Sequence, residues 1–159
     1  MLAIIVAAAL GASPAQQVKD LHEALLAPVR QCLAGAGSPE ACLSAAHDRC
    51  VARFTAGTDP LVDSWCARAE NEGWEAVRLD AESRLDTVLS KYPEADIQAA
   101  VQAGRKAWET YRDQWGEAES RTKPTALTGE SDLARETCRK ALTQDRLMRV
   151  RQMIDWRND

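Results

Sequence analysis

Apolar residues recur every three or four positions over most of this chain, which is the spacing that places side chains on one face of an α-helix. From Gln16 to about Leu33 the apolar positions are Val18, Leu21, Leu25, Val29 and Leu33. No run alternates with the period of two that marks a strand, and aromatic residues make up only 5% of the chain. The pattern therefore predicts an all-helical protein.

Proline, glycine and capping residues divide the rest of the pattern into four further helices. Ser38-Pro39-Glu40 and Thr58-Asp59-Pro60 each place a proline at the first helical position behind a capping side chain. We expect helices from there to about Phe54, and from Pro60 to about Tyr92 with a bend or interruption at Gly73. A fourth helix follows Pro93-Glu94, and after a polar loop at residues 122–129 a last helix runs over about 131–156.

The helix after Pro93 has the most regular stripe, with spacings of four and three through Ile97, Val101, Gly104, Trp108, Tyr111 and Trp115. Such a seam is typical of helices that pack in a nearly parallel arrangement. Four tryptophans fall on apolar stripes, where packing in the core is their more common use: Trp65, Trp74, Trp108 and Trp115.

The last helix carries a basic stretch on an otherwise acidic chain: Arg135, Arg139, Lys140, Arg146, Arg149 and Arg151. Cations toward a helix C-terminus interact favourably with the helix dipole. We favour that interpretation over a basic binding patch.

A chain of 159 residues with 45% hydrophobic and 28% charged residues is an ordinary single globular domain. We expect a bundle of four to five helices with short connections. The net charge of −4 argues against a nucleic-acid or anionic-membrane partner and permits a cationic one. It leaves the oligomeric state open.

The N-terminus resembles a secretory leader. An apolar run, LAIIVAAAL at residues 2–10, precedes a small-residue cleavage site at Ser13-Pro14-Ala15. This divides the chain into a signal peptide at 1–15 and one domain at 16–159. Ser13 stands where a lipoprotein would have its acylated cysteine, so we expect a soluble periplasmic or secreted protein without a membrane anchor. A buried N-terminal helix is the alternative.

Five cysteines are present, at Cys32, Cys42, Cys50, Cys66 and Cys138. In an oxidising compartment the first four would form two disulfides, for which three connectivities are possible. Closure between nearest neighbours, Cys32 with Cys42 and Cys50 with Cys66, is the simplest and would staple two helix–helix corners. Cys138 is left as an unpaired thiol that we expect to be buried.

No motif in the sequence indicates catalysis, a metal or a cofactor. His22 and His47 are the only histidines, and neither lies in a metal-ligand or triad spacing. No glycine-rich phosphate loop precedes a Lys-Ser/Thr pair. The 24 acidic residues leave open a hydrolase that uses paired carboxylates, although we expect no enzyme.

Two motifs stand in the C-terminal half, W-E-T-Y-R-D at residues 108–113 and C-R-K-A-L-T-Q-D-R at 138–146, with Thr128-Gly129-Glu130-Ser131 between them. Upstream, Cys66, Glu70, Trp74 and Glu75 add a third element. Together they resemble the lysozyme inhibitor LprI-like N-terminal domain family, whose motifs are W-x-x-[YF]-R-D, C-x-x-x-L-T-x-x-R and C-x-x-x-E-x-x-x-W-D. The remaining matches are Trp108, Tyr111, Arg112, Asp113, Cys138, Leu142, Thr143 and Arg146.

Three departures accompany the resemblance. The family's Leu-Asn pair fits Leu79-Asp80 only after a one-residue slip, its next tyrosine is replaced near Glu82, and a cysteine expected near Gly116 is absent. That cysteine would be the family partner of Cys138.

The resemblance implies an exported helical domain, which in one branch of the family binds and inhibits lysozyme. A lysozyme-type wall-cleaving enzyme is then the candidate partner, and the matched residues are first of all structural. The alternative is a structural or envelope-stress interaction protein that never contacts lysozyme.

Overall fold

A computed structural model describes residues 39–54, 60–92, 95–123 and 128–158, together with five single positions before them (23, 27, 31, 34 and 35). Four helices lie within the described ranges: α3 (Pro39–Phe54), α4 (Pro60–Leu89), α5 (Ala95–Arg121) and α6 (Thr128–Asn158). No strand occurs among these residues. The prediction of a small all-α bundle is confirmed.

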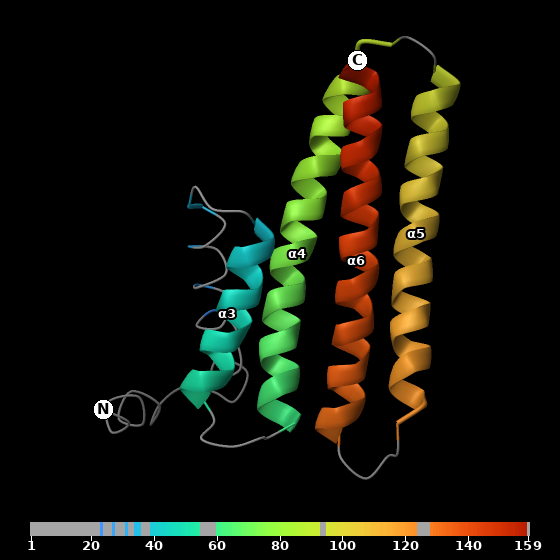
Figure 1. The fold of residues 1–159 in the computed structure, drawn as a ribbon. Coiled ribbons are helices and arrows are strands. Elements are labelled where there is room, and N and C mark those ends of the chain that lie inside the picture. The colour runs from blue at the N-terminus through green and yellow to red at the C-terminus, as the bar shows by residue number, and fades with distance from the viewer. Residues whose placement is uncertain are drawn as a thin grey trace, which may run out of the picture.

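Three long helices form the body of the molecule (Figure 1). They run up, down and up along the chain, with α6 lying between α4 and α5 in this view. The shorter α3 packs against the first half of α4 on the side away from α5. The close backbone approaches are those of α6 with α4 and with α5, so α6 is the shared neighbour of the other two long helices.

The helix boundaries agree with the sequence pattern except at three points. Gly73 does not interrupt α4, which passes through it as a continuous helix. That helix ends at Leu89 instead of Tyr92, because the Tyr92 amide bonds the Leu89 carbonyl at 2.9 Å and closes a turn. The last helix begins at Thr128, three residues before the expected Ser131.

The apolar core lies between α4 and α6. Its buried members are Leu43, Trp74, Ala81, Leu85, Leu89, Leu147, Val150 and Ile154. From α5 only Ile97 and Val101, both in its first two turns, pack against this cluster. The rest of α5 is held to its neighbours by other means.

A disulfide joins α3 to α4. Cys50 is bonded to Cys66, with a Cα separation of 5.7 Å, and the pair packs with Ala69, Val51 and Val62. This is one of the two expected nearest-neighbour closures. Cys42 is also disulfide-bonded, whereas its expected partner Cys32 lies outside the described residues.

Two of the four tryptophans expected in the core are not there. Trp74 is buried and Trp108 is partly buried, but Trp65 and Trp115 are 40% and 53% exposed. On α5 three members of the apolar stripe predicted by spacing face outward, Gly104, Tyr111 and Trp115, whereas Trp108 is partly buried. The side facing α4 and α6 also carries Arg105, Arg112, Gly116 and Ser120. A stripe of polar residues at helical spacing takes the place of the expected apolar seam.

The expected leader and the helix at residues 16–33 lie outside the described residues, apart from the single positions named above. Within the described part, no helix has the length and hydropathy needed to span a membrane.

Candidate functional site

Two oppositely charged residues of α4 lie one helical turn apart in the interior. Arg78 is 1% exposed and Glu82 is 2% exposed. The Arg78 guanidinium donates to the Glu82 carboxylate through Nη1. Burying an ion is costly unless other charges and hydrogen bonds compensate it, so the surroundings of this pair decide whether it is stable.

Glu82 receives guanidinium groups from all three long helices. Besides Arg78 of α4, Arg105 of α5 approaches its Oε2 at 2.8 Å and Arg146 of α6 donates to its Oε1 at 3.1 Å. One buried carboxylate thus connects α4, α5 and α6. Through Glu82, α5 is attached to α4 and α6 where it makes few apolar contacts with them.

Arg78 in turn contacts two more carboxylates. It forms two hydrogen bonds with Glu75 on its own helix and approaches Glu109 of α5 at 3.4 Å. Arg112 of α5 reaches the same Glu75 at 2.8 Å. We call these seven charged residues the arginine–glutamate network: Glu75, Arg78, Glu82, Arg105, Glu109, Arg112 and Arg146.

Trp108 lies at the centre of the network. The guanidinium carbons of Arg78, Arg112 and Arg146 lie 4.9, 5.1 and 5.9 Å from its ring centroid. An indole face attracts cations through its quadrupole, which offsets the repulsion among three neighbouring positive charges. The ring is therefore held by ions instead of by an apolar core.

The network favours the ionised forms of Glu75 and Arg112. Burial by itself would raise the pKa of Glu75, but hydrogen bonds and charge from Arg78 and Arg112 lower that pKa below its ordinary value overall. Burial opposes the charged form of Arg112, yet Glu75 and Asp113 raise its pKa. Both partners of the Glu75–Arg112 bridge are charged at neutral pH.

A second polar layer lies nearer the start of α4. Glu70, 2% exposed, accepts hydrogen bonds from Trp74 Nε1 at 3.3 Å and Lys140 Nζ at 3.1 Å. Asp113 accepts from Arg139 of α6 at 2.8 Å and pairs with Arg112. The layer extends the ionic connections among the three helices.

These contacts correct the interpretation of the basic stretch in α6. The main contacts of three of these cations are not with the helix dipole. Each bonds a carboxylate of another helix: Arg139, Lys140 and Arg146. Arg149 behaves differently, pairing with Asp145 at 3.0 Å on the exposed side of its own helix. The stretch is chiefly a set of links between helices.

The residues of the family resemblance come together in part. Trp108, Arg112, Asp113 and Arg146 meet in the network or directly beside it. Trp74 is in the adjoining core, Thr143 is fully buried, and Leu142 is partly buried. Tyr111 lies apart from them, half exposed on the outside of α5.

Sequence reasoning missed the residues on which the network depends most, Arg78, Glu82 and Arg105. A usable signal was present, since Arg78 and Glu82 stand between the apolar positions Trp74, Val77, Ala81 and Leu85. Charged residues at a spacing of four inside an apolar stripe are expected to meet opposite charges when they are buried.

At Gly116, where the resemblance expects a cysteine, α6 comes close. A Cβ there would lie 3.0 Å from Cγ of Arg139. Cys138 is a free thiol and is partly exposed, not buried as expected. Burial and the charge of Glu119 both raise the pKa of this thiol, so it is a poor nucleophile at neutral pH.

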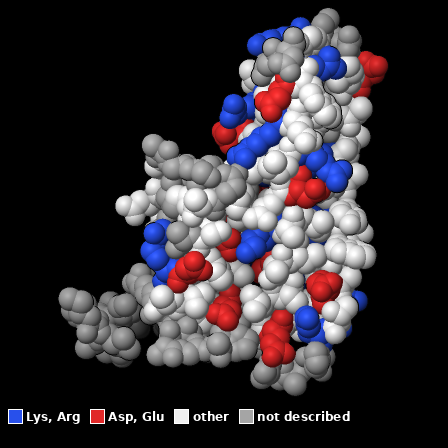
Figure 2. All heavy atoms as spheres, viewed as in Figure 1, with Lys and Arg blue, Asp and Glu red and all other residues white. Residues whose placement is uncertain are grey.

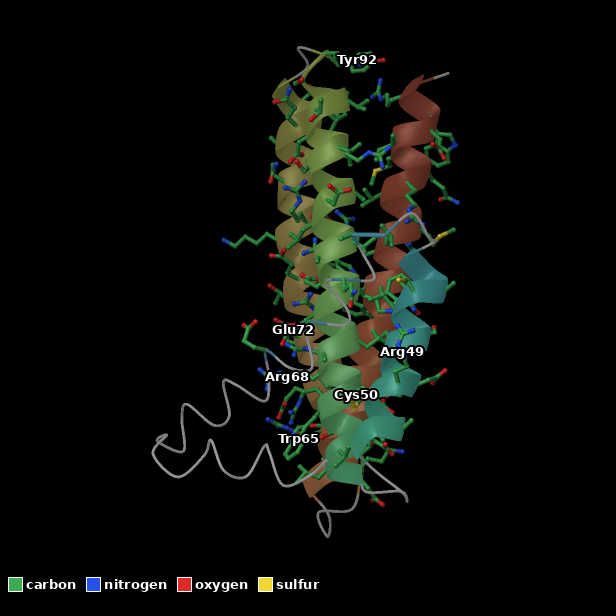
Figure 3. All side chains as sticks on the ribbon, turned by 90° about the vertical axis from the view of Figure 1, so that its left-hand side faces the viewer. Arg49, Cys50, Trp65, Arg68, Glu72 and Tyr92 are labelled. Atoms are coloured by element: carbon green, nitrogen blue, oxygen red, sulfur yellow. A yellow bond between two sulfur atoms is a disulfide. The ribbon has the colours of Figure 1, made fainter. Side chains whose placement is uncertain are left out.

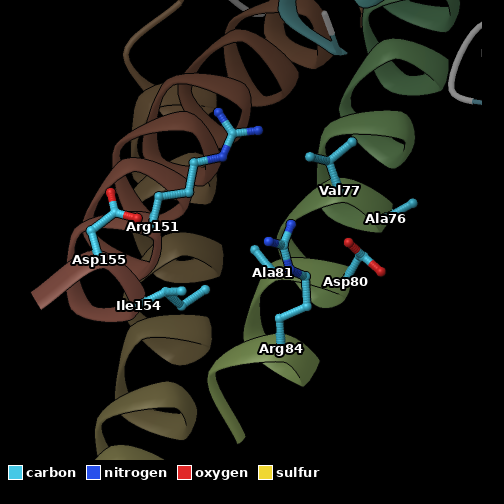
Figure 4. A pocket seen from close by; sticks show the side chains of 8 residues that line it. All are labelled: Ala76, Val77, Asp80, Ala81, Arg84, Arg151, Ile154 and Asp155. Atoms are coloured by element: carbon cyan, nitrogen blue, oxygen red, sulfur yellow. The ribbon is translucent and has the colours of Figure 1, made fainter. Parts of the chain in front are cut away.

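A groove of about 370 Å³ opens between α4 and α6 (Figure 4). Its floor includes Ala81 and Ile154, and four charged side chains border it: Asp80, Arg84, Arg151 and Asp155. Both arginines reach into the space between the helices, whereas Asp80 and Asp155 point away from each other. The groove does not bring two carboxylates together as glycoside hydrolysis requires.

Among the residues described, His47 lies 3.8 Å from Asp48 on the outside of α3, and no group of three His, Cys, Asp or Glu could hold a metal ion. His22 is outside the described residues.

Comparison with family models, with curated proteins and with solved structures found no match to this chain.

Proposed function

We propose that this chain is an exported helical binding protein of the LprI-like type, which acts by contact and not by catalysis, and that its partner is a lysozyme-type wall-cleaving enzyme. The supporting observation is the meeting of Trp108, Arg112 and Arg146. These residues belong to two motifs of the resemblance that are separated by a loop. Their contact gives the combined motif a physical role in joining α5 to α6.

The chemistry of the interior also favours binding over catalysis. Catalytic acids and bases need a group that can change protonation near neutral pH and reach a substrate. In the network, each of the seven charged residues already contacts opposite charge within the chain. These groups stabilise a rigid scaffold whose outer surface is left for a partner.

The test is lysozyme turnover in the presence of the purified exported protein. We expect saturable inhibition on a short soluble oligosaccharide substrate, and a complex with lysozyme alone by titration calorimetry. Full turnover at micromolar excess, with no heat of binding, would instead favour a structural or envelope-stress role.

Export has its own measurement. The tryptic peptide at residues 31–49 contains both Cys32 and Cys42, whereas Cys50 and Cys66 fall in separate peptides, 50–53 and 54–68. We expect the protein from the periplasm to yield 50–53 linked to 54–68 and to take up one alkyl group, at Cys138, when unfolded without reduction. An uncleaved cytosolic protein with five free thiols would contradict export.

A further inference from the structure

A second groove lies at the upper end of the bundle in Figure 1, where α4 ends and α6 reaches its last turns. It has a volume of about 320 Å³ and opens among the three long helices. Six apolar residues line it, two from each helix: Leu85, Leu89, Ile97, Val101, Met153 and Trp156. Small-molecule sites are mostly apolar and have volumes of about 300–1,000 Å³, so this groove has the size and lining of a small one.

The floor of the groove is part of the apolar core, whereas its rim is exposed. Leu85 and Leu89 are buried members of the core, and Ile97, Val101 and Met153 pack against its edge. Trp156 is 72% exposed. Along α5, which supplies one wall, the surface in Figure 2 is largely white, with few charged side chains. An apolar ligand in the groove would extend the core outward and cover part of the exposed indole.

One charged residue, Arg157, also lines the groove. Its guanidinium carbon lies 4.9 Å from the centroid of the Tyr92 ring, and the Tyr92 hydroxyl donates to the Arg157 carbonyl at 3.0 Å. Figure 3 shows Tyr92 at this end of the bundle, beyond the end of α4. Tyr92 therefore holds Arg157 beside the apolar side chains. We call Arg157 and the six apolar residues the terminal groove.

Arg157 differs from the arginines of the arginine–glutamate network in its partners. Each arginine of the network contacts Glu75 or Glu82. Within the part of the chain that the structure describes, Arg157 stacks on an aromatic ring and makes no ion pair with a carboxylate. A guanidinium has five N–H donors in a planar fork that matches a carboxylate, so the donors of Arg157 suit an anionic group of a ligand.

An apolar groove with one guanidinium fits a ligand that has an apolar body and a single anionic end. The carbon chain of a fatty acid would lie against the leucine, isoleucine, valine and methionine side chains, and its carboxylate would pair with Arg157. A ligand with several polar groups fits less well, because the only other polar side-chain atom of the lining is the indole nitrogen of Trp156. We propose that the terminal groove binds a free fatty carboxylate of medium length.

The proposed ligand is a single molecule and not the surface of a bilayer. A volume of about 320 Å³ suits one chain, whereas a protein that lies on a membrane needs a long apolar face flanked by many cations. The net charge of −4 also opposes approach to an anionic bilayer. The inference does not rest on lysozyme inhibition.

The experiment titrates the full protein with sodium hexanoate, octanoate and decanoate, each below its critical micelle concentration. Calorimetry and tryptophan fluorescence follow the binding. We expect saturable binding of one carboxylate per chain, with a dissociation constant that falls about fourfold for each added CH₂ that the groove buries. 1-Octanol has the same chain as octanoate without a charge, and we expect it to bind about tenfold more weakly.

Two variants test the residues at the rim. Arg157→Gln should weaken octanoate binding about tenfold and leave 1-octanol binding unchanged, because only the carboxylate uses the guanidinium. Trp156→Ala should weaken both ligands and remove the fluorescence change. Both side chains are exposed, so the variants should keep the circular dichroism spectrum of the wild type.

Arg121→Gln is the matched control. Arg121 is the basic residue in the last turn of α5, as Arg157 is in the last turn of α6, and it is exposed and outside the terminal groove. We expect this variant to bind octanoate like the wild type. Equal losses in Arg121→Gln and Arg157→Gln would show general attraction of an anion to surface cations and overturn the proposal.

Other results would also overturn it. Octanol that binds as tightly as octanoate would remove the role of Arg157. If octanoate does not bind, but the protein sediments with phosphatidylglycerol vesicles and Trp156→Ala abolishes this, the groove is a membrane contact. If octanoate does not bind and light scattering shows a dimer that Trp156→Ala dissociates, it is a contact between two copies of the chain. Octanoate binding without lysozyme inhibition would remove the proposed function and leave this inference standing.

Discussion

At Glu82, three guanidinium groups from three helices meet one buried carboxylate. A buried ion pair is not by itself evidence of high stability, because desolvation offsets much of the attraction. Removing the Glu82 charge is still costly, because Arg78 stays buried with one carboxylate fewer and Arg146 loses the carboxylate that it bonds. Arg78, 1% exposed, is shielded from water by the surrounding helices, whereas Arg146 is 14% exposed.

We expect Glu82→Gln to destabilise the protein by about 3–5 kcal/mol, because Arg146 loses the carboxylate that it bonds, although Arg105 keeps Asp86, at 3.0 Å, as its carboxylate partner. Urea unfolding with the disulfides intact measures the change. Asp145→Asn is the control, since Asp145 and Arg149 form an exposed pair at 3.0 Å and such pairs contribute about 0–1 kcal/mol. Similar losses in the two variants would contradict the role given to Glu82.

At the scale of the helices, α5 explains where spacing analysis succeeded and where it failed. Its existence and limits follow from proline and loop residues on either side, and these local signals act within the sequence itself. Which side of α5 faces the interior cannot be predicted from the spacing, because some of its interior positions are charged, among them Arg105 and Arg112. Spacing rules assign charged residues to the solvent side, and only the opposite charges on α4 make these two arginines stable inside.

Two glycines of α5 test its orientation. Gly104 is exposed with nothing within 4 Å of an added Cβ, so Gly104→Ala should stabilise the helix by about 0.5–1 kcal/mol. At Gly116 the same methyl group would press on the Arg139 side chain at 3.0 Å. We expect Gly116→Ala to gain less than Gly104→Ala, or to destabilise, in urea unfolding. An equal gain at both positions would mean that α6 does not approach Gly116.

In the whole molecule, the arginine–glutamate network and the apolar core hold different helices together. The apolar cluster holds α4 and α6 together, and the disulfide holds α3 to α4, whereas α5 is joined to the others largely by ion pairs. The fold class, the four described helices and the Cys50–Cys66 closure could be predicted from sequence. The ionic interior could not, because contacts such as Arg146–Glu82 join residues 64 positions apart.

This dependence on ion pairs predicts acid sensitivity. Glu75 and Asp113, which tie α5 to α4 and α6, both have a pKa lowered in the folded state; burial opposes the shift and hydrogen bonds to arginines outweigh it. In the unfolded chain these carboxyls have their ordinary pKa values of 4.5 and 3.8. As the pH falls, the unfolded chain therefore binds protons at a higher pH than the folded protein does. Their contribution is therefore complete above about pH 5 and is lost progressively below it.

Urea midpoints measured from pH 7 to pH 3 give this dependence. We expect a steep fall in stability below about pH 4.5, and a shallower fall in the double variant Glu75→Gln, Asp113→Asn, which starts from a lower stability at pH 7. Other carboxylates and the rising net positive charge also act in acid, so the difference in slope between the two proteins is the decisive quantity. Parallel curves would mean that the two bridges contribute nothing to holding α5 in the bundle.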